Sequence, residues 1–183
     1  MAEKEVFTSW QRFLPKQPKL APSVFVARTA DVVGAVSVDE DSSIWFQAVV
    51  RADINEIIIG QRTNIQDGCI LHVADDYPVR IGDDVTCGHR AVIHACHISD
   101  RVLVGMGAII LDGAEIGSDS IIGAHTLVTQ GTKVPPGSLI LGSPGKVIRS
   151  LGAKEIAALP RMAAKYVAVA TAYRSSPSTT NNK

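Results

Sequence analysis

Three histidines carry the strongest chemical signal in this sequence: His72, His89 and His94. Neutral imidazole nitrogens are common ligands for divalent transition metals, and three of them with one open coordination position form a site that can activate water. His72 and His94 are 22 residues apart, and His89 lies between them. Whether the three side chains can meet depends on the elements that position them.

A six-residue repeat carries these histidines. From Ile98 onward an aliphatic residue returns at every sixth position, and a small or short residue follows four positions after each one. The aliphatic series is Ile98, Val104, Ile110, Ile116, Ile122, Val128, Val134 and Ile140. A hexapeptide period predicts a parallel β-helix. Three hexads then form one triangular coil, with the aliphatic residues pointing inward and the short residues at the corners.

The same period reaches back to Val26, with an insertion at 55–58 and an interruption at 74–78. Short hexads that end in Gly or Asp favour tight corners rather than hairpins. We therefore expect one β-helix domain over residues 23–149.

The two ends of the chain differ from the repeats. Residues 1–22 are rich in Pro and Lys and are expected to form an irregular arm. Residues 150–174 carry apolar side chains at helical spacing, which predicts a C-terminal α-helix that is broken or restarted at Pro160. Residues 175–183 are polar and are expected to form a disordered tail.

The register of the repeat decides where the histidines point. His72 and His94 each follow an inward aliphatic residue, so both side chains should point outward from the same face, one coil apart. Adjacent strands lie about 4.8 Å apart, which lets two imidazoles converge on one zinc ion. Arg51 has the corresponding position one coil earlier and belongs to the same column.

His89 occupies a different place, as the third residue of the hexad that Cys87 begins. It should therefore lie on the preceding face and should not meet the other two histidines within one chain. A second copy of the chain can present it instead, and heterologous contacts that close into a ring predict a homotrimer with metal at each interface. The alternative interpretation is that the three are unrelated surface or interface histidines.

Composition excludes several classes of partner. The 18 Lys and Arg residues balance 18 Asp and Glu residues, so we expect no nucleic-acid partner and no polybasic membrane contact. No apolar stretch reaches the length of a membrane span, and the N-terminus lacks the apolar core of a secretory signal. The three cysteines have no paired metal spacing, so Cys69 and Cys87 are expected to be small buried side chains. These features favour a cytoplasmic protein.

An ordered set of motifs resembles the γ-class carbonic anhydrase family over about residues 20–174. The motifs are Arg51-Ala52-Asp53, Asn64-Ile65-Gln66-Asp67-Gly68 through His72, Gly88-His89, His94, and Leu141-Gly142-Ser143-Pro144-Gly145-Lys146. The resemblance implies an all-β fold, a left-handed parallel β-helix of hexapeptide repeats with a C-terminal α-helix, assembled as a homotrimer. Handedness comes from the resemblance alone, because a six-residue period does not reveal it.

The resemblance also implies roles for individual residues. His72, His89 and His94 would be ligands of zinc, with iron or cobalt as the other candidate ions. Gln66 matches the glutamine that orients the reacting water, and Asn64 belongs to the same motif. Arg51 and Asp53 match an Arg-x-Asp pair, with Arg51 as a bicarbonate contact. By register Arg51 could pair with Asp67 across the interface, and a salt-bridged seam without a catalytic role is the alternative there. Tyr166 could approach the site, although Tyr166 and Tyr173 at i and i+7 are also typical of packing.

The activity that these residues imply is the metal-dependent, reversible hydration of carbon dioxide to bicarbonate. We expect slow turnover, because only Asp75 and Asp76 follow His72, whereas the best-studied active form of the family carries an acidic loop with glutamates near the site. A coenzyme A-dependent acyltransferase or a thioester hydrolase is one alternative, since hexapeptide proteins also transfer acyl groups. A metal-binding assembly or accessory protein with weak or no activity is another.

Overall fold

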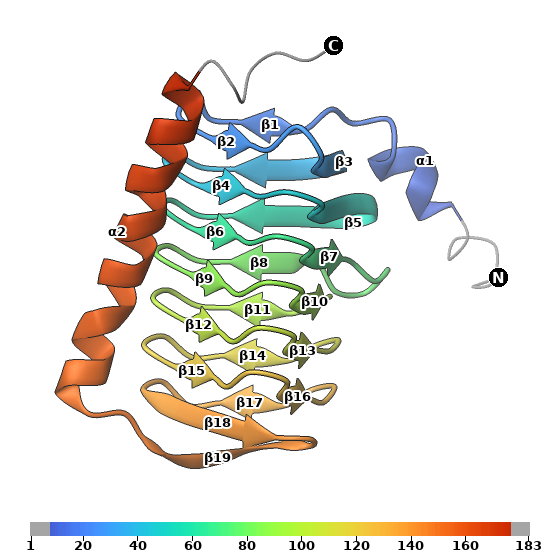
Figure 1. Ribbon diagram of the computed structural model, residues 1–183. Coiled ribbons are helices and arrows are strands. Elements are labelled where there is room, and N and C mark those ends of the chain that lie inside the picture. The colour runs from blue at the N-terminus through green and yellow to red at the C-terminus, as the bar shows by residue number, and fades with distance from the viewer. Residues whose placement is uncertain (1–7, 177–183) are drawn as a thin grey trace, which may run out of the picture.

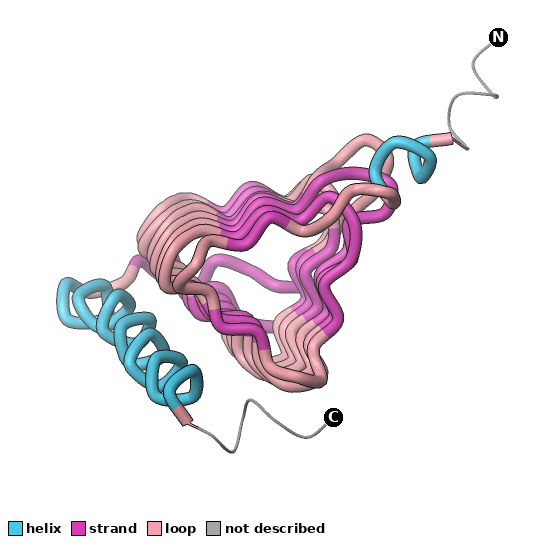
Figure 2. The backbone as a smooth tube through the Cα atoms, turned by 90° about the horizontal axis from the view of Figure 1, so that it is seen from above, coloured by secondary structure: helices cyan, strands magenta, loops and turns pink. Residues whose placement is uncertain are grey.

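The chain winds into a triangular prism of stacked coils, with one long helix outside it (Figures 1 and 2). The computed structural model describes residues 8–176 of the 183-residue chain. The predicted left-handed parallel β-helix of hexapeptide repeats with a C-terminal helix is confirmed as the fold class. None of the described helices is long and apolar enough to span a membrane.

Three faces make up the prism, and their strands pair in parallel from coil to coil. Face 1 contains the first parts of β3 (Asp31–Val38) and β5 (Val49–Ile59), then β7 (Ile70–His72), β10 (Val92–His94), β13 (Ile109–Ile110) and β16 (Leu127–Val128). Face 2 contains β1 (Lys19–Leu20), the second parts of β3 and β5, β8 (Val79–Ile81), β11 (His97–Ile98), β14 (Glu115–Ile116) and β17 (Lys133–Val134).

Face 3 is the side along which the long helix runs. It contains β2 (Phe25–Val26), β4 (Ser43–Ile44), β6 (Asn64–Ile65), β9 (Thr86–Cys87), β12 (Leu103–Val104), β15 (Ile121–Ile122) and β18 (Ser138–Gly142). The antiparallel strand β19 (Gly145–Ser150) pairs with β18 and ends the stack. The helix α2 (Ala153–Ser175) contacts β2, β4, β6 and β9.

The aliphatic series predicted to point inward forms the core of the prism. All eight of its members from Ile98 to Ile140 are buried. Cys69 and Cys87 are buried as well, as expected, and burial raises the pKa of the Cys69 thiol to about 12. The periodicity therefore identified which side chains of these coils point into the core.

The helix α2 is continuous, so the predicted break at Pro160 is wrong. Leu159 and Ala163 are buried on either side of this proline, and packing against the prism holds the helix together where one backbone hydrogen bond is lost. Arg149 and the backbone N–H of Gly152 both hydrogen-bond the Glu155 carboxylate at the start of the helix.

The N-terminal arm is more regular than expected. It contains a short helix α1 (Ser9–Phe13) and the strand β1, which pairs with β3. The Ser9 hydroxyl donates to Asp75 Oδ1 at 2.6 Å and ties the arm to the loop after β7. Most of the predicted disordered tail, residues 177–183, lies outside the described residues.

The edge between face 2 and face 3 carries a column of alternating charge. Its members are Asp41, Arg62, Asp84, Arg101 and Asp119, all with φ between 53° and 59°. Arg101 donates two hydrogen bonds to Asp119, at 2.7 and 2.9 Å. These bonds hold the pKa of Asp119 below its ordinary value. Opposite charges stacked one coil apart therefore support the corners of the prism.

We expect Asp119→Asn to lower the free energy of unfolding of metal-free protein at neutral pH by about 0.5–1 kcal/mol. Because folding lowers the pKa of Asp119, its contribution is present above the unfolded pKa of about 3.9 and disappears as the pH falls through the folded pKa. Denaturant unfolding at several pH values should show the wild type and the variant converging below about pH 4. Asp39→Asn, at an exposed position, is the control, and a difference that persists unchanged at acid pH would contradict this account.

Candidate metal centre

A continuous row of polar side chains crosses face 1. The strand register places Arg51, His72 and His94 side by side on β5, β7 and β10. Nδ1 of His72 lies 3.1 Å from Nε2 of His94, and the ring centroids are 5.2 Å apart. The prediction that the two histidines share one face and lie one coil apart agrees with this geometry.

Carboxylates hold the outer nitrogen of each ring. Asp53 Oδ1 lies 3.0 Å from His72 Nε2, and Asp112 Oδ1 lies 2.5 Å from His94 Nδ1. An ionised carboxylate can only accept a hydrogen bond, so these contacts favour neutral rings that carry their proton on the nitrogen facing the carboxylate, the outer nitrogen. The two inner nitrogens then face each other as lone pairs, and a cation between them would relieve their repulsion.

The donor geometry fits a metal ion. Two nitrogens bound at 2.0–2.1 Å to a tetrahedral zinc would lie about 3.3–3.4 Å apart, close to the 3.1 Å between the inner nitrogens. Metal-bound histidines also donate their other N–H to a carboxylate or a carbonyl in most sites, which is the arrangement of Asp53 and Asp112 here. His72 and His94 are therefore suited to hold zinc from one side.

Electrostatics favour the neutral form of His72 that a metal requires. Burial lowers the pKa of His72 more than its hydrogen bond to the Asp53 carboxylate raises it. Burial alone would raise the pKa of Asp53, but the hydrogen bonds from His72 and Arg51 outweigh it, and the pKa lies below its ordinary value. Arg51 pairs with Asp53 in its own chain, and the contact of Arg51 with Asp67 of another copy stays a prediction.

His89 lies in a second cluster, on the edge between face 3 and face 1. Its Nδ1 is 3.0 Å from Asp67 Oδ2, so this histidine also has an aspartate on one ring nitrogen and keeps Nε2 free for a ligand. Gly88 precedes His89, at a point where two neighbouring coils lie close together. A Cβ atom at this position would lie 2.8 Å from the backbone nitrogen of Met106. This glycine lets the corner carry His89 outward.

Gln66 and Asn64 lie with His89 rather than with His72 and His94. The Gln66 side-chain Nε2 donates to Asn64 Oδ1 at 3.0 Å, and Asn64 in turn donates to Thr86 Oγ1 at 3.0 Å. Both amides are buried, so their orientation is fixed. Gln66 is thus held with its side chain beside the groove that His89 lines.

An apolar groove of about 530 Å³ opens beside His89, between face 3 and α2. Its lining includes Gln66, His89, Leu103, Met106, Met162 and Tyr166. Tyr166 also packs edge-on against Trp45, with centroids 5.7 Å apart, and burial raises its pKa. Tyr173 belongs to the same aromatic cluster, with Trp45 and Phe25. Both tyrosines thus anchor the helix, and Tyr166 additionally borders the groove.

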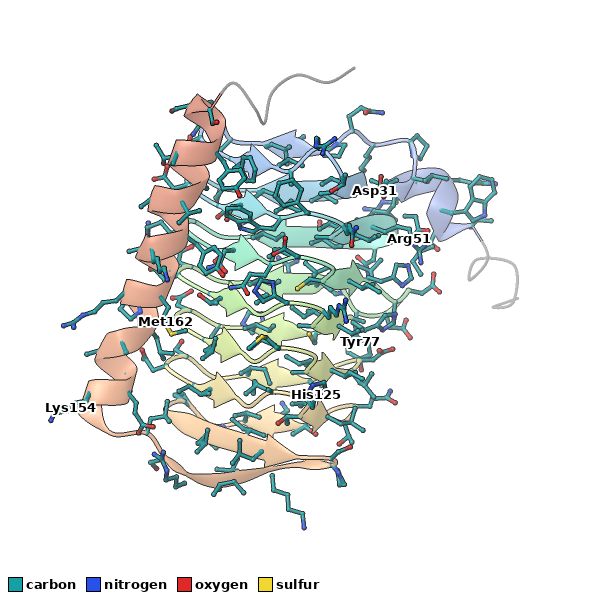
Figure 3. The ribbon with its side chains drawn as sticks, viewed as in Figure 1. Asp31, Arg51, Tyr77, His125, Lys154 and Met162 are labelled. Carbon is teal, nitrogen blue, oxygen red and sulfur yellow. The ribbon has the colours of Figure 1, made fainter. Side chains whose placement is uncertain are left out.

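The candidate site residues therefore form two half-sites. Arg51, Asp53, His72, His94 and Asp112 make up the face 1 half-site, and Asn64, Gln66, Asp67, His89 and Tyr166 make up the His89 half-site. Within residues 8–176, no group of three or more His, Cys, Asp or Glu side chains is arranged to hold a metal. Figure 3 labels Arg51 of the face 1 half-site on the side of the prism away from α2, and Met162, which lines the groove beside His89, on α2.

The remaining two histidines lack this pattern. His97 Nε2 lies 3.4 Å from the Ser99 hydroxyl on face 2, and His125 occupies a corner with φ of 56° beside Gly107. Neither makes an ion pair with an aspartate in the part of the chain that the structure describes. An aspartate partner therefore distinguishes the three predicted ligands from the other histidines.

Comparison with known proteins agrees with the motifs. Residues 95–130 match the family model described as bacterial transferase hexapeptide (six repeats). The chain is 48% identical over 148 residues to a probable carbonic anhydrase of Methanocaldococcus jannaschii, covering 81% of this chain and 93% of that protein. The chain belongs to the γ-carbonic-anhydrase-like hexapeptide-repeat family.

Other relatives of this γ-carbonic-anhydrase-like chain carry different descriptions. It is 41% identical over 166 residues to mitochondrial gamma carbonic anhydrase 2 of Arabidopsis thaliana, covering 87% of this chain but only 60% of that protein's length. A crystal structure of a Bacillus cereus protein, described as an acetyltransferase candidate, superimposes with a TM-score of 0.86 at 49% identity. That match covers 87% of this chain and 93% of the other.

Asp112 is the site residue that the sequence did not reveal. It stands 18 residues after His94, but the shortened hexad between them shifts the register. The strand pairing places Ile93 beside Ile110, so the residue after Ile110 is the one aligned with His94, and Asp112 begins the following corner. A spacing rule alone therefore does not predict the contact.

Metal analysis of variants of this γ-carbonic-anhydrase-like protein tests the ligand assignment. We expect His72→Ala and His94→Ala each to abolish stoichiometric zinc, because each removes one of the two converging nitrogens. His97→Ala and His125→Ala are matched controls that should retain the metal content of the wild type. Elemental analysis of purified proteins checks this, and loss of metal in His125→Ala would show that the assignment is wrong.

Proposed function

We propose that this protein is a γ-class carbonic anhydrase that catalyses the reversible, metal-dependent hydration of carbon dioxide to bicarbonate at the interfaces of a homotrimer. One observation carries the proposal: each of the three predicted ligand histidines has an aspartate on one ring nitrogen, and the two inner nitrogens of His72 and His94 converge. Family membership supports it, because several relatives are named carbonic anhydrases.

Assembly would join the two half-sites. Face 1 exposes an apolar column beside its histidines, in which Ile70 and Ile109 are 46% and 37% exposed. The groove next to His89 is apolar as well, with Leu103 and Met106 in its lining. A neighbouring copy seated with its face 1 against this groove would bury both surfaces and bring His89 toward His72 and His94. The same contact closes a ring when it repeats three times.

Within such a site the chain's own residues would bind the metal, orient the attacking oxygen and neutralise the charge of the bicarbonate product. Zinc bound there would lower the pKa of a coordinated water and supply hydroxide near neutral pH, as it does in carbonic anhydrases of known mechanism. Gln66, fixed by Asn64, would hold the attacking oxygen in line with the carbon of the substrate. Arg51 supplies a positive charge for the bicarbonate product, and Asp53 holds that guanidinium beside His72.

Mixed assemblies test whether each site is shared between chains. His72→Ala and His89→Ala chains should each be inactive alone. Refolded together in equal amounts, they should recover roughly a quarter of the wild-type hydration rate, because each mixed trimer regains one interface with all three histidines. Native mass spectrometry verifies that mixed trimers form. Mixed trimers without any recovered activity would overturn the shared site.

The proton pathway predicts slow turnover that depends on buffer. The loop after β7 offers Asp75 and Asp76, and Asp75 is engaged by the Ser9 hydroxyl. Carboxylates are weak bases and poor proton acceptors at neutral pH, and efficient proton transfer favours groups that titrate near the working pH. Stopped-flow hydration should therefore accelerate with the concentration of an imidazole-type buffer at constant pH. Fast turnover indifferent to buffer would show that another group exports the proton.

Acyl transfer from coenzyme A is a second candidate function, because the groove beside His89 is large enough for a bulkier substrate. Its volume of about 530 Å³ exceeds what carbon dioxide needs, and the Bacillus cereus relative is described as an acetyltransferase candidate. Turnover of acetyl-coenzyme A by metal-free protein would favour this reading. The same assay with zinc-loaded protein and no acceptor would reveal thioester hydrolysis.

A further inference from the structure

We propose that Asp112 is a positioning residue that fixes the proton of His94 on Nδ1, so that His72 and His94 are held in opposite tautomers. His94 then presents Nε2, and His72 presents Nδ1 because Asp53 holds its Nε2 proton. The use of these nitrogens by a metal rests on the proposed function. The tautomers themselves are a property of the metal-free chain.

The contact distances allow one arrangement of protons when both rings are neutral. A proton on the inner nitrogen of either ring would make the 3.1 Å contact between His72 Nδ1 and His94 Nε2 a hydrogen bond. That ring would then turn a lone pair toward its own carboxylate, at 3.0 Å for Asp53 or 2.5 Å for Asp112. Repulsion between an anion and a lone pair costs more than one neutral hydrogen bond gains. Both protons therefore lie on the outer nitrogens.

The corner that carries Asp112 is rigid enough to impose this choice. The backbone N–H of Leu111 donates to Val128 O at 3.0 Å, and that of Gly131 donates to Asp112 O at 2.9 Å. Both bonds come from pairing with the next coil, so the stack fixes the backbone that carries Asp112, and its carboxylate reaches His94 Nδ1 from there at 2.5 Å. His94 and Asp112 are each about one-third exposed, which leaves their hydrogen bond only partly screened by water.

Fixing the proton matters because imidazole binds metal only through an unprotonated nitrogen. If the proton of His94 were free to move to Nε2, that nitrogen would have to lose it, or the ring would have to turn, before His72 and His94 could bind one ion together. Loss of a carboxylate partner of a ligand histidine reduces metal affinity by about 10–100-fold in known sites. We expect the same range for Asp112.

Two measurements on the full-length protein test the proposal. Nitrogen NMR of metal-free protein labelled in its histidines, at a pH where the imidazoles are neutral, reports which ring nitrogen carries the proton. We expect Nδ1–H for His94 and Nε2–H for His72. Asp112→Ala should shift His94 toward Nε2–H and leave His72 unchanged, while Asp112→Glu, which keeps a carboxylate that can only accept, should largely preserve Nδ1–H. Zinc affinity, measured by competition with a chelator, should fall about 10–100-fold in Asp112→Ala and less in Asp112→Glu.

Asp39→Ala, at an exposed corner away from face 1, is the matched control and should change neither measurement. Unchanged His94 tautomer and zinc affinity within twofold of wild type in Asp112→Ala would overturn the proposal. Wild-type protein that binds no zinc, yet shows the expected tautomers and their shift in Asp112→Ala, would refute the proposed function and support the role of Asp112. Zinc-dependent hydration of carbon dioxide by the wild type, together with a His94 tautomer that does not change in Asp112→Ala, would support the proposed function and refute the role of Asp112.

Discussion

The register of the stacked coils is the constraint on which the rest of this structure depends. Each coil buries its aliphatic residues inward, and a slip of one residue would turn that whole set toward solvent. Because the register is fixed in this way, outward residues far apart in sequence lie in straight columns. Arg51, His72 and His94 form one such column, although the turns between β5, β7 and β10 differ in length. The packing of the core therefore sets the positions of Arg51, His72 and His94, although these side chains lie outside the core.

Two carboxylates determine how the histidines of this column are oriented and protonated. A column places two imidazoles side by side, but it does not choose the tautomers of the rings. Asp53 and Asp112 make that choice from opposite ends of the row. With neutral imidazoles, Arg51 and the two aspartates sum to one negative charge, so the row as a whole attracts a cation. Arg51 supports Asp53 as well, because its charge helps keep that carboxylate ionised despite partial burial.

Much of this could be predicted from sequence, and the misses share a cause. The period of six identified the core, the faces, and the separation of His89 from His72 and His94, because all of these follow from counting along a regular coil. The continuity of α2 through Pro160 was missed because it comes from packing of Leu159 and Ala163 against the prism. Asp112 was missed because a shortened hexad moves it out of the counted column. Sequence periodicity predicts regular positions, and tertiary contacts decide the exceptions.

Placement of His89 on an edge of the prism, away from His72 and His94 on face 1, has a thermodynamic consequence under the proposed function. A single chain offers a metal two converging nitrogens, and the third comes with a neighbour. Metal would then bind the assembled state more tightly than the separate chains, and a ligand that prefers one state stabilises that state by mass action. Linkage is reciprocal, so assembly raises metal affinity as much as metal favours assembly. An unassembled chain would hold metal weakly, and the reactive centre would form only where two copies meet. Each of the three histidines has its aspartate partner within the same chain. Each half-site therefore orients its own ligands before two copies assemble.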